Sequence, residues 1–181
     1  MSMNVQFPPL GNATVPLISF IRPHHRHYFS GRPERPNYRV RKYDFPGIVH
    51  VMPLVRAYLD TCAAEYPADF RYLFTLLGSE LANNAIRHSL SNRPGATYSL
   101  LAERHADGLR LICRDRGNGD RDPAPLQVSG CAFDLEAESG RGLAIVDAYS
   151  QAWGERARYA SRDVWFYLGA ESPAAAETVR G

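Results

Sequence analysis

The sequence has few cysteines, no long hydrophobic run and almost no lysine. The cysteines are Cys62, Cys113 and Cys131, and their odd number and spacing fit neither a zinc site nor a disulfide framework, so reduced thiols are expected. No apolar run reaches the roughly 18 residues that span a bilayer, and the N-terminus lacks the pattern of a signal peptide. These absences exclude a disulfide-rich secreted domain and a membrane span, and we expect a cytoplasmic protein.

The residues that are present point to one domain with a basic arm. Hydrophobic residues make up 45% of the 181 residues, enough for the core of a single domain. The net charge of +2 is uneven, because residues 20–42 hold seven Arg or Lys residues and one Glu. Such an arm is usually solvated. Contact with an acidic partner stays open, and we expect no nucleic-acid ligand.

Composition divides the chain into three regions. Residues 1–37 carry repeated prolines without periodicity, which indicates a poorly ordered extension whose apolar residues could dock in part. Residues 38–170 are expected to form the domain, and residues 171–181 a flexible tail. Within the domain, residues 116–139 lack periodicity and are rich in Gly, Asp, Pro and Ser. A loop of this length in a compact domain is usually functional or disordered.

Hydrophobic periodicity and turn signals predict the order strand, helix, helix, strand, strand, helix, strand, strand. The expected bounds are 38–45, 48–65, 68–89, 97–104, 109–115, 142–152, 155–159 and 164–168. Two predicted hairpins favour a mixed β sheet over an all-parallel one. With its helices on one face, the sheet would form a two-layer α/β sandwich.

A polar stripe runs along the second predicted helix. Its members, at positions i, i+3, i+4 and i+7, are Glu80, Asn83, Asn84 and Arg87. The stripe either faces solvent or lines a polar cavity, and the paired asparagines, which are poor helix formers, favour the cavity. The carboxylate of Glu80 and the amide of Asn84 lie one turn apart and suit Mg²⁺, a hard cation that takes few protein ligands.

Asp115 ends a predicted strand and is followed by Gly117 and Gly119. Asp-x-Gly-x-Gly can be an ordinary turn. Alternatively, the carboxylate accepts a hydrogen bond from the exocyclic amine of adenine, and the glycines let the backbone approach the ring closely. The motif alone leaves both interpretations open.

A second glycine motif opens the third predicted helix. It comprises Ser139, Gly140, Arg141, Gly142 and Leu143. The free amides and the positive dipole end of such a terminus form an anion site, and Arg141 could add a charge-assisted bond to phosphate. No Gly-Lys-Ser/Thr follows, so the motif is not a P-loop. A simple helix-entry turn remains the alternative.

The order of these motifs resembles that of the histidine-kinase-like (GHKL) ATPase superfamily, and most closely its anti-sigma-factor serine/threonine kinase branch. Glu80–His88 looks like the N box of that branch, Asp115–Gly119 its G1 box and Gly140–Val146 its G2 box. Val164–Leu168 is similar to its closing strand. The resemblance covers residues 38–169 and implies a Bergerat-type ATP-binding fold.

The resemblance also implies a role for each motif residue. Glu80 would be the general base, Asn84 would hold Mg²⁺, Asp115 would bind adenine, and residues 120–139 would form a lid over ATP. The implied nucleotide-binding residues are Asn84, Arg87, Asp115, Gly117, Gly119, Ser139, Gly140, Arg141, Gly142 and Leu143.

The chain departs from the family pattern at two places. Asn83 stands where relatives usually carry a small hydroxyl residue, and residues 161–163 stand where they often have a Lys-Thr pair. If Asp163 pointed into the site, its charge would disfavour phosphate. These departures bear on the catalytic rate more than on the fold.

The function implied by the resemblance is an ATP- and Mg²⁺-dependent serine/threonine protein kinase. It would phosphorylate an antagonist protein, sequester a sigma factor as an anti-sigma factor-like switch, and act as a homodimer. The alternative is a nucleotide-gated protein-binding module with weak catalysis. Glu80 separates the two, because only the kinase needs it.

Overall fold

The computed structural model describes residues 16–33, 37–117, 141–158 and 160–170, in which η marks short 3-10 helices. The elements in chain order are η1 (Leu17–Phe20), η2 (Pro23–Phe29), β1 (Val40–Pro46), η3 (Val49–Val51), α1 (Met52–Cys62), α2 (Ala68–His88), η4 (Leu90–Asn92), β2 (Thr97–His105), β3 (Gly108–Asp115), α3 (Arg141–Tyr149), β4 (Ala152–Arg158) and β5 (Ser161–Gly169). None of the helices in these ranges combines the length and apolar character that a bilayer crossing requires.

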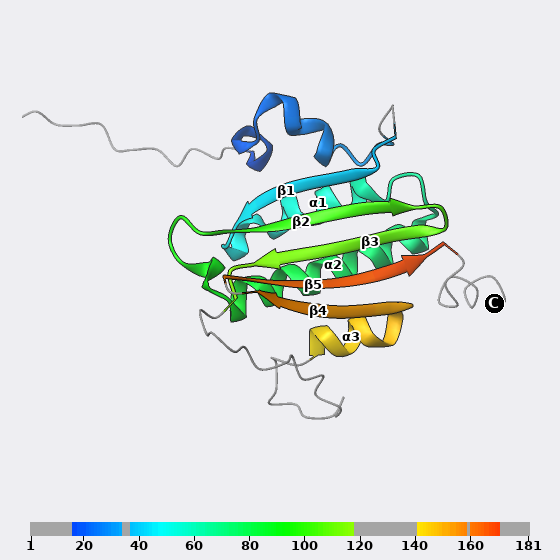
Figure 1. Cartoon of the computed structure of the whole chain (residues 1–181). Coiled ribbons are helices and arrows are strands. Elements are labelled where there is room, and N and C mark those ends of the chain that lie inside the picture. Colours follow the sequence, from blue (N-terminus) through cyan, green and yellow to red (C-terminus); the bar gives the residue numbers. More distant parts are fainter. Residues whose placement is uncertain (1–15, 34–36, 118–140, 159, 171–181) are drawn as a thin grey trace, which may run out of the picture.

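The five strands form one sheet in the order β1-β2-β3-β5-β4, and α1 and α2 cover the same face of it (Figure 1). The predicted two-layer α/β sandwich is therefore confirmed. All four pairings are antiparallel, where a mixed sheet was predicted. Strands β3 and β4 do run in the same direction, but β5 lies between them. Two consecutive helices separate β1 from β2, so the chain returns antiparallel to β1.

The core lies between the sheet and the two long helices. Alternate residues of the central strands face the helices, as Leu100, Leu111 and Phe166 do with fully buried side chains. Gly78 allows α2 to approach closely, because a Cβ there would lie 2.8 Å from side-chain atoms of Leu59 and of Leu111. This packing fixes the position of α2, the helix that carries the predicted N box.

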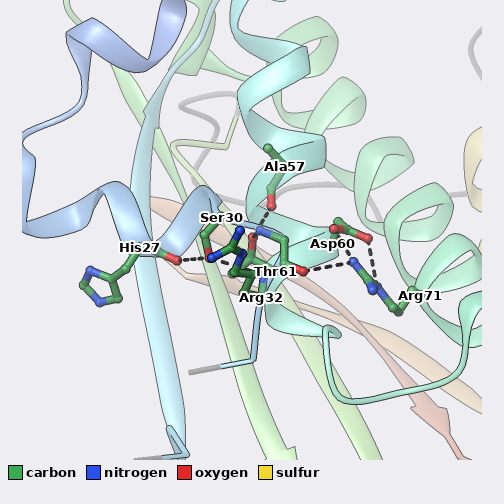
Figure 2. A network of polar contacts seen from close by, with 8 residues as sticks. His27, Ser30, Arg32, Ala57, Asp60, Thr61 and Arg71 are labelled. Atoms are coloured by element: carbon green, nitrogen blue, oxygen red, sulfur yellow. Dashed lines mark hydrogen bonds and ion pairs between the residues drawn. The ribbon is translucent and has the colours of Figure 1, made fainter. Parts of the chain in front are cut away.

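Residues 16–33 lie along the β1 edge of the sheet, with η2 packed against α1 (Figure 1). Tyr28 and Phe29 pack on the hydrophobic core. Gly31 has a φ of 66° and donates its N–H to Oγ1 of Thr61 at 2.8 Å. Arg71 donates to the carbonyl of Gly31 at 3.4 Å and pairs with Asp60 (Figure 2). We call Gly31, Asp60, Thr61 and Arg71 the docking cluster. The predicted boundaries at residues 37 and 170 stay predictions.

Candidate nucleotide-binding site

Helix α2 holds the predicted N-box residues on the side that is not packed into the core. Leu77, Leu81 and Ala85 are buried, whereas Glu80 and Asn84 are half-buried. The Nδ2 atom of Asn84 is buried and has no hydrogen-bond partner among the described residues. A buried donor without a partner costs free energy, roughly 1–3 kcal/mol. Asn84 is therefore a group that a ligand could satisfy.

Asp115 ends β3 on the face that meets the helices, and only 8% of it is exposed. Burial is the main cause that raises the pKa of its carboxyl, and a hydrogen bond from the Gly117 N–H and the charge of Arg162 act in the opposite direction. The Gly117 N–H donates to Oδ1 at 2.6 Å, from a turn in which Gly117 has a φ of 57°. A left-handed φ of this kind favours glycine, which explains why the motif needs Gly117.

The first turn of α3 lies directly against Glu80. A Cβ on Gly142 would lie 2.6 Å from Oε2 of Glu80, so only glycine leaves room for the carboxylate as it stands. Leu143 and Val146 are buried in the core and anchor the helix. Glu80 therefore lies beside the end of α3 at which backbone amides and the helix dipole attract anions.

The three motifs converge on one side of the domain. The tip of β3, the last turns of α2 and the first turn of α3 all lie at the same end in Figure 1. Of the remaining predicted residues, Arg87 is exposed near the end of α2 and Arg141 begins α3. Gly119, Ser139, Gly140 and the predicted lid, 120–139, lie outside the described residues. The nucleotide contacts of all these residues stay predictions.

The family model of the histidine kinase-like ATPase domain matches residues 49–163, more than half of the chain. The chain belongs to this family. The matched segment contains α2, β3, the start of α3 and the residues between them. No curated protein matches the chain significantly. Membership of the family implies ATP binding and points to ATP-dependent activity.

Strand β5 carries the departure from the family pattern, and its register shows where each side chain lies. Asp163 pairs opposite Arg114 on the face of the sheet away from the helices, and Arg114 donates to its two oxygens at 2.6 and 2.9 Å. Its side chain therefore points away from the helix face, although its charge adds to the causes that raise the pKa of Asp115. Arg162 instead lies opposite Asp115 on the helix face, with 7% of it exposed. Motif reasoning missed Arg162, because only the pairing of two distant strands reveals it.

The donor groups of this ATPase domain fit the ligands that the family implies. An amide offers both a donor and an acceptor, so Asn84 can give its oxygen to Mg²⁺ and its NH₂ to a phosphate oxygen. Asp115 can accept from an adenine amine. The glycine at position 142 leaves room for the carboxylate of Glu80, and the backbone amides at that helix terminus can donate to a phosphate.

Proposed function

We propose that this protein is an ATP- and Mg²⁺-dependent serine/threonine protein kinase that acts as an anti-sigma factor-like switch. The observation that carries the proposal is the position of Glu80. Its carboxylate lies one helical turn from Asn84 and against Gly142 in the first turn of α3. A carboxylate between a metal-binding amide and an anion-binding helix terminus is placed to act as a general base on a hydroxyl near a phosphate.

Phosphoryl transfer depends on positioning and on neutralising charge more than on covalent chemistry with the protein. Glu80 would take the proton of a partner's serine or threonine hydroxyl. The hydroxyl oxygen would form a bond to the γ-phosphorus of ATP, and the bond to the bridging oxygen would break to release ADP. Mg²⁺, when held by Asn84, would supply neutralisation of phosphate charge. Asp115 would fix the adenine so that the phosphates reach α3.

The proposed partners are an antagonist protein, which receives the phosphate, and a sigma factor, which the kinase sequesters. This part of the proposal is supported by the likeness of the three motifs to the anti-sigma-factor kinase branch. A homodimer is proposed on the same ground. Recovery of a sigma factor or of a small antagonist-type protein with the purified chain would support these partners.

The alternative is a nucleotide-gated binding module that uses Asn84, Asp115 and the glycines without useful catalysis. Nδ2 of Asn84, which has no partner among the described residues, and the buried carboxylate of Asp115 would serve binding in either case. Only the kinase requires a base at Glu80. The two functions therefore differ in whether they require the Glu80 carboxylate.

The test compares Glu80→Gln with the wild type in two assays, ATP binding and transfer of labelled phosphate from ATP to candidate antagonist proteins with Mg²⁺. A kinase should lose about 10²- to 10⁴-fold in transfer rate and keep its affinity for ATP. Glu103→Gln is the matched control, because Glu103 lies half-buried on β2 and faces away from the helices. Equal transfer by Glu80→Gln and wild type, or intact ATP binding without transfer to any antagonist, would favour the binding module.

A further inference from the structure

The connection between α2 and β2 is held in one conformation by the hydroxyl groups of two serines. Ser89 donates its hydroxyl to the carbonyl of Ala85 at 2.7 Å and accepts from the N–H of Ser91 at 3.0 Å. Ser91 is fully buried, although it lies in a connection between elements. Because loops usually run over the surface, a fully buried serine in this connection calls for a physical reason.

The reason lies in the turn that follows Asp115. The hydroxyl oxygen of Ser91 accepts the N–H of Arg116 at 3.0 Å. Next to this bond, Leu90 donates its N–H to the carbonyl of Gly117 at 2.8 Å. The N–H of Gly117 in turn donates to the carboxylate of Asp115 at 2.6 Å. A continuous set of hydrogen bonds therefore connects the end of α2 to the Asp115 carboxylate.

Close packing holds Ser91 in this position from the other side. A Cβ on Gly47 would lie 1.8 Å from the carbonyl oxygen of Ser91, so the backbone after β1 presses against this serine. The segment after β1, the connection from α2 to β2 and the turn after β3 thus meet at one buried residue. Ser91 has little freedom to move, and neither has the turn that it binds.

We propose that Ser91 is a positioning residue that sets the orientation of Asp115 for recognition of the adenine amine. This inference rests on the proposed adenine-binding role of Asp115. Removal of the hydroxyl leaves the Arg116 N–H without its acceptor and frees the Asp115–Gly117 turn to relax. Because the hydrogen bond from the adenine amine depends on the direction of the carboxylate, the relaxed turn recognises adenine less well, whereas contacts to the phosphates stay.

The experiment measures the affinity of Ser91→Ala for ATP and for inosine triphosphate, which lacks the exocyclic amine, by displacement of a fluorescent nucleotide. The wild type should prefer ATP. The variant should bind ATP about tenfold more weakly, as expected for loss of one hydrogen bond, and should bind inosine triphosphate almost unchanged. Ser91→Thr, which keeps the hydroxyl, should restore most of the preference.

Thr61→Val is the matched control, because Thr61 is also a buried hydroxyl residue that accepts a backbone N–H from a distant segment, that of Gly31 at 2.8 Å. It should leave the preference for ATP intact. If Ser91→Ala does not fold, Leu90→Pro carries the test, since it removes the N–H that binds Gly117, along with the leucine side chain, at a helix start where proline is tolerated. It should lower the preference for ATP in the same way.

The outcomes separate this inference from the function on which it rests. A folded Ser91→Ala or Leu90→Pro variant with the wild-type preference would overturn the positioning role, as would an equal loss in Thr61→Val. A wild type that binds ATP and inosine triphosphate equally would instead show that Asp115 does not read the adenine amine.

Discussion

Thr61 at one end of the α1–α2 layer and Asn84 at the other differ in how their buried polar atoms are satisfied. At the docking cluster, Thr61 accepts from Gly31 and donates to the carbonyl of Ala57, and Arg71 donates to Asp60 (Figure 2). At the nucleotide end, Nδ2 of Asn84 has no partner among the described residues. Asp115 is buried there with a pKa raised by that burial.

We propose that this difference separates groups that stabilise the fold from groups that a bound nucleotide would satisfy. A polar group that finds its partner within the chain contributes to stability. One that is buried without full compensation lowers stability and gains when a ligand arrives. Substitutions at the docking cluster should therefore change stability and spare binding, and substitutions at the nucleotide end should do the reverse.

The largest effect on ATP affinity is expected from Asp115→Asn. Its affinity for ATP should fall about 10- to 100-fold, because the adenine amine loses a charged acceptor and can meet the NH₂ of asparagine instead. Its stability against denaturant should not fall, because the change removes a buried charge. Calorimetric titration with ATP and denaturant unfolding measure the two effects. Unchanged affinity, or a large loss of stability, would contradict the proposed role of Asp115.

A smaller effect is expected from Gly142→Ala. The new Cβ would lie 2.6 Å from Oε2 of Glu80, so the carboxylate must turn away from the first turn of α3. The rate of phosphoryl transfer should fall about tenfold, as expected for a misplaced base. Stability should hold, since alanine favours a helix over glycine by up to about 1 kcal/mol. If the free energy of unfolding falls together with the transfer rate, the substitution has disturbed the helix and not Glu80 alone.

Thr61→Val tests the other side of the comparison. Loss of the hydroxyl leaves the Gly31 N–H without its acceptor and should lower the free energy of unfolding by about 1 kcal/mol. ATP affinity should not change. Thr97→Val, at an exposed position of β2, is the control and should stay within about 0.5 kcal/mol of wild type. A loss of ATP affinity in Thr61→Val would show that the two ends are coupled.

The sequence predicted the elements best where the local pattern is strong. Helix α2 was expected at 68–89 and runs from Ala68 to His88, because its apolar periodicity is long. The preceding helix was expected from residue 48, but η3 comes first and α1 begins at Met52, next to Pro53. The helix expected at 142–152 ends at Tyr149.

Packing between distant segments explains the remaining differences. Strand β4 was expected at 155–159 and begins at Ala152, since Trp153 pairs opposite Phe166 and packs on the core. The sequence pattern around Trp153 does not indicate this pairing with a distant strand. The role of Ser91 could not be predicted for a similar reason. A serine between elements resembles any turn residue in the sequence, and only the fold brings the Arg116 N–H to its hydroxyl.

The smallest expected effect concerns pH, and it separates the two ends most directly. Burial raises the pKa of Asp115 in the folded state above its ordinary value of 3.8. The protonated carboxyl is therefore favoured by folding. Its contribution to stability is fully present below 3.8 and is lost as pH rises through the folded pKa. ATP binding should strengthen over the same interval, because the ionised carboxylate is the better acceptor.

Denaturant unfolding at a series of pH values measures the first effect, and ATP titration at the same values measures the second. In Asp115→Asn both pH dependences should shrink, whereas Thr61→Val should follow the wild-type curves at lower stability, because it removes no titrating group. Stability and binding that rise together with pH in the wild type would contradict the idea that burial of Asp115 is a cost to folding that ATP offsets. If stability falls while ATP affinity rises with increasing pH, burial of Asp115 at the nucleotide end lowers stability and favours ATP binding.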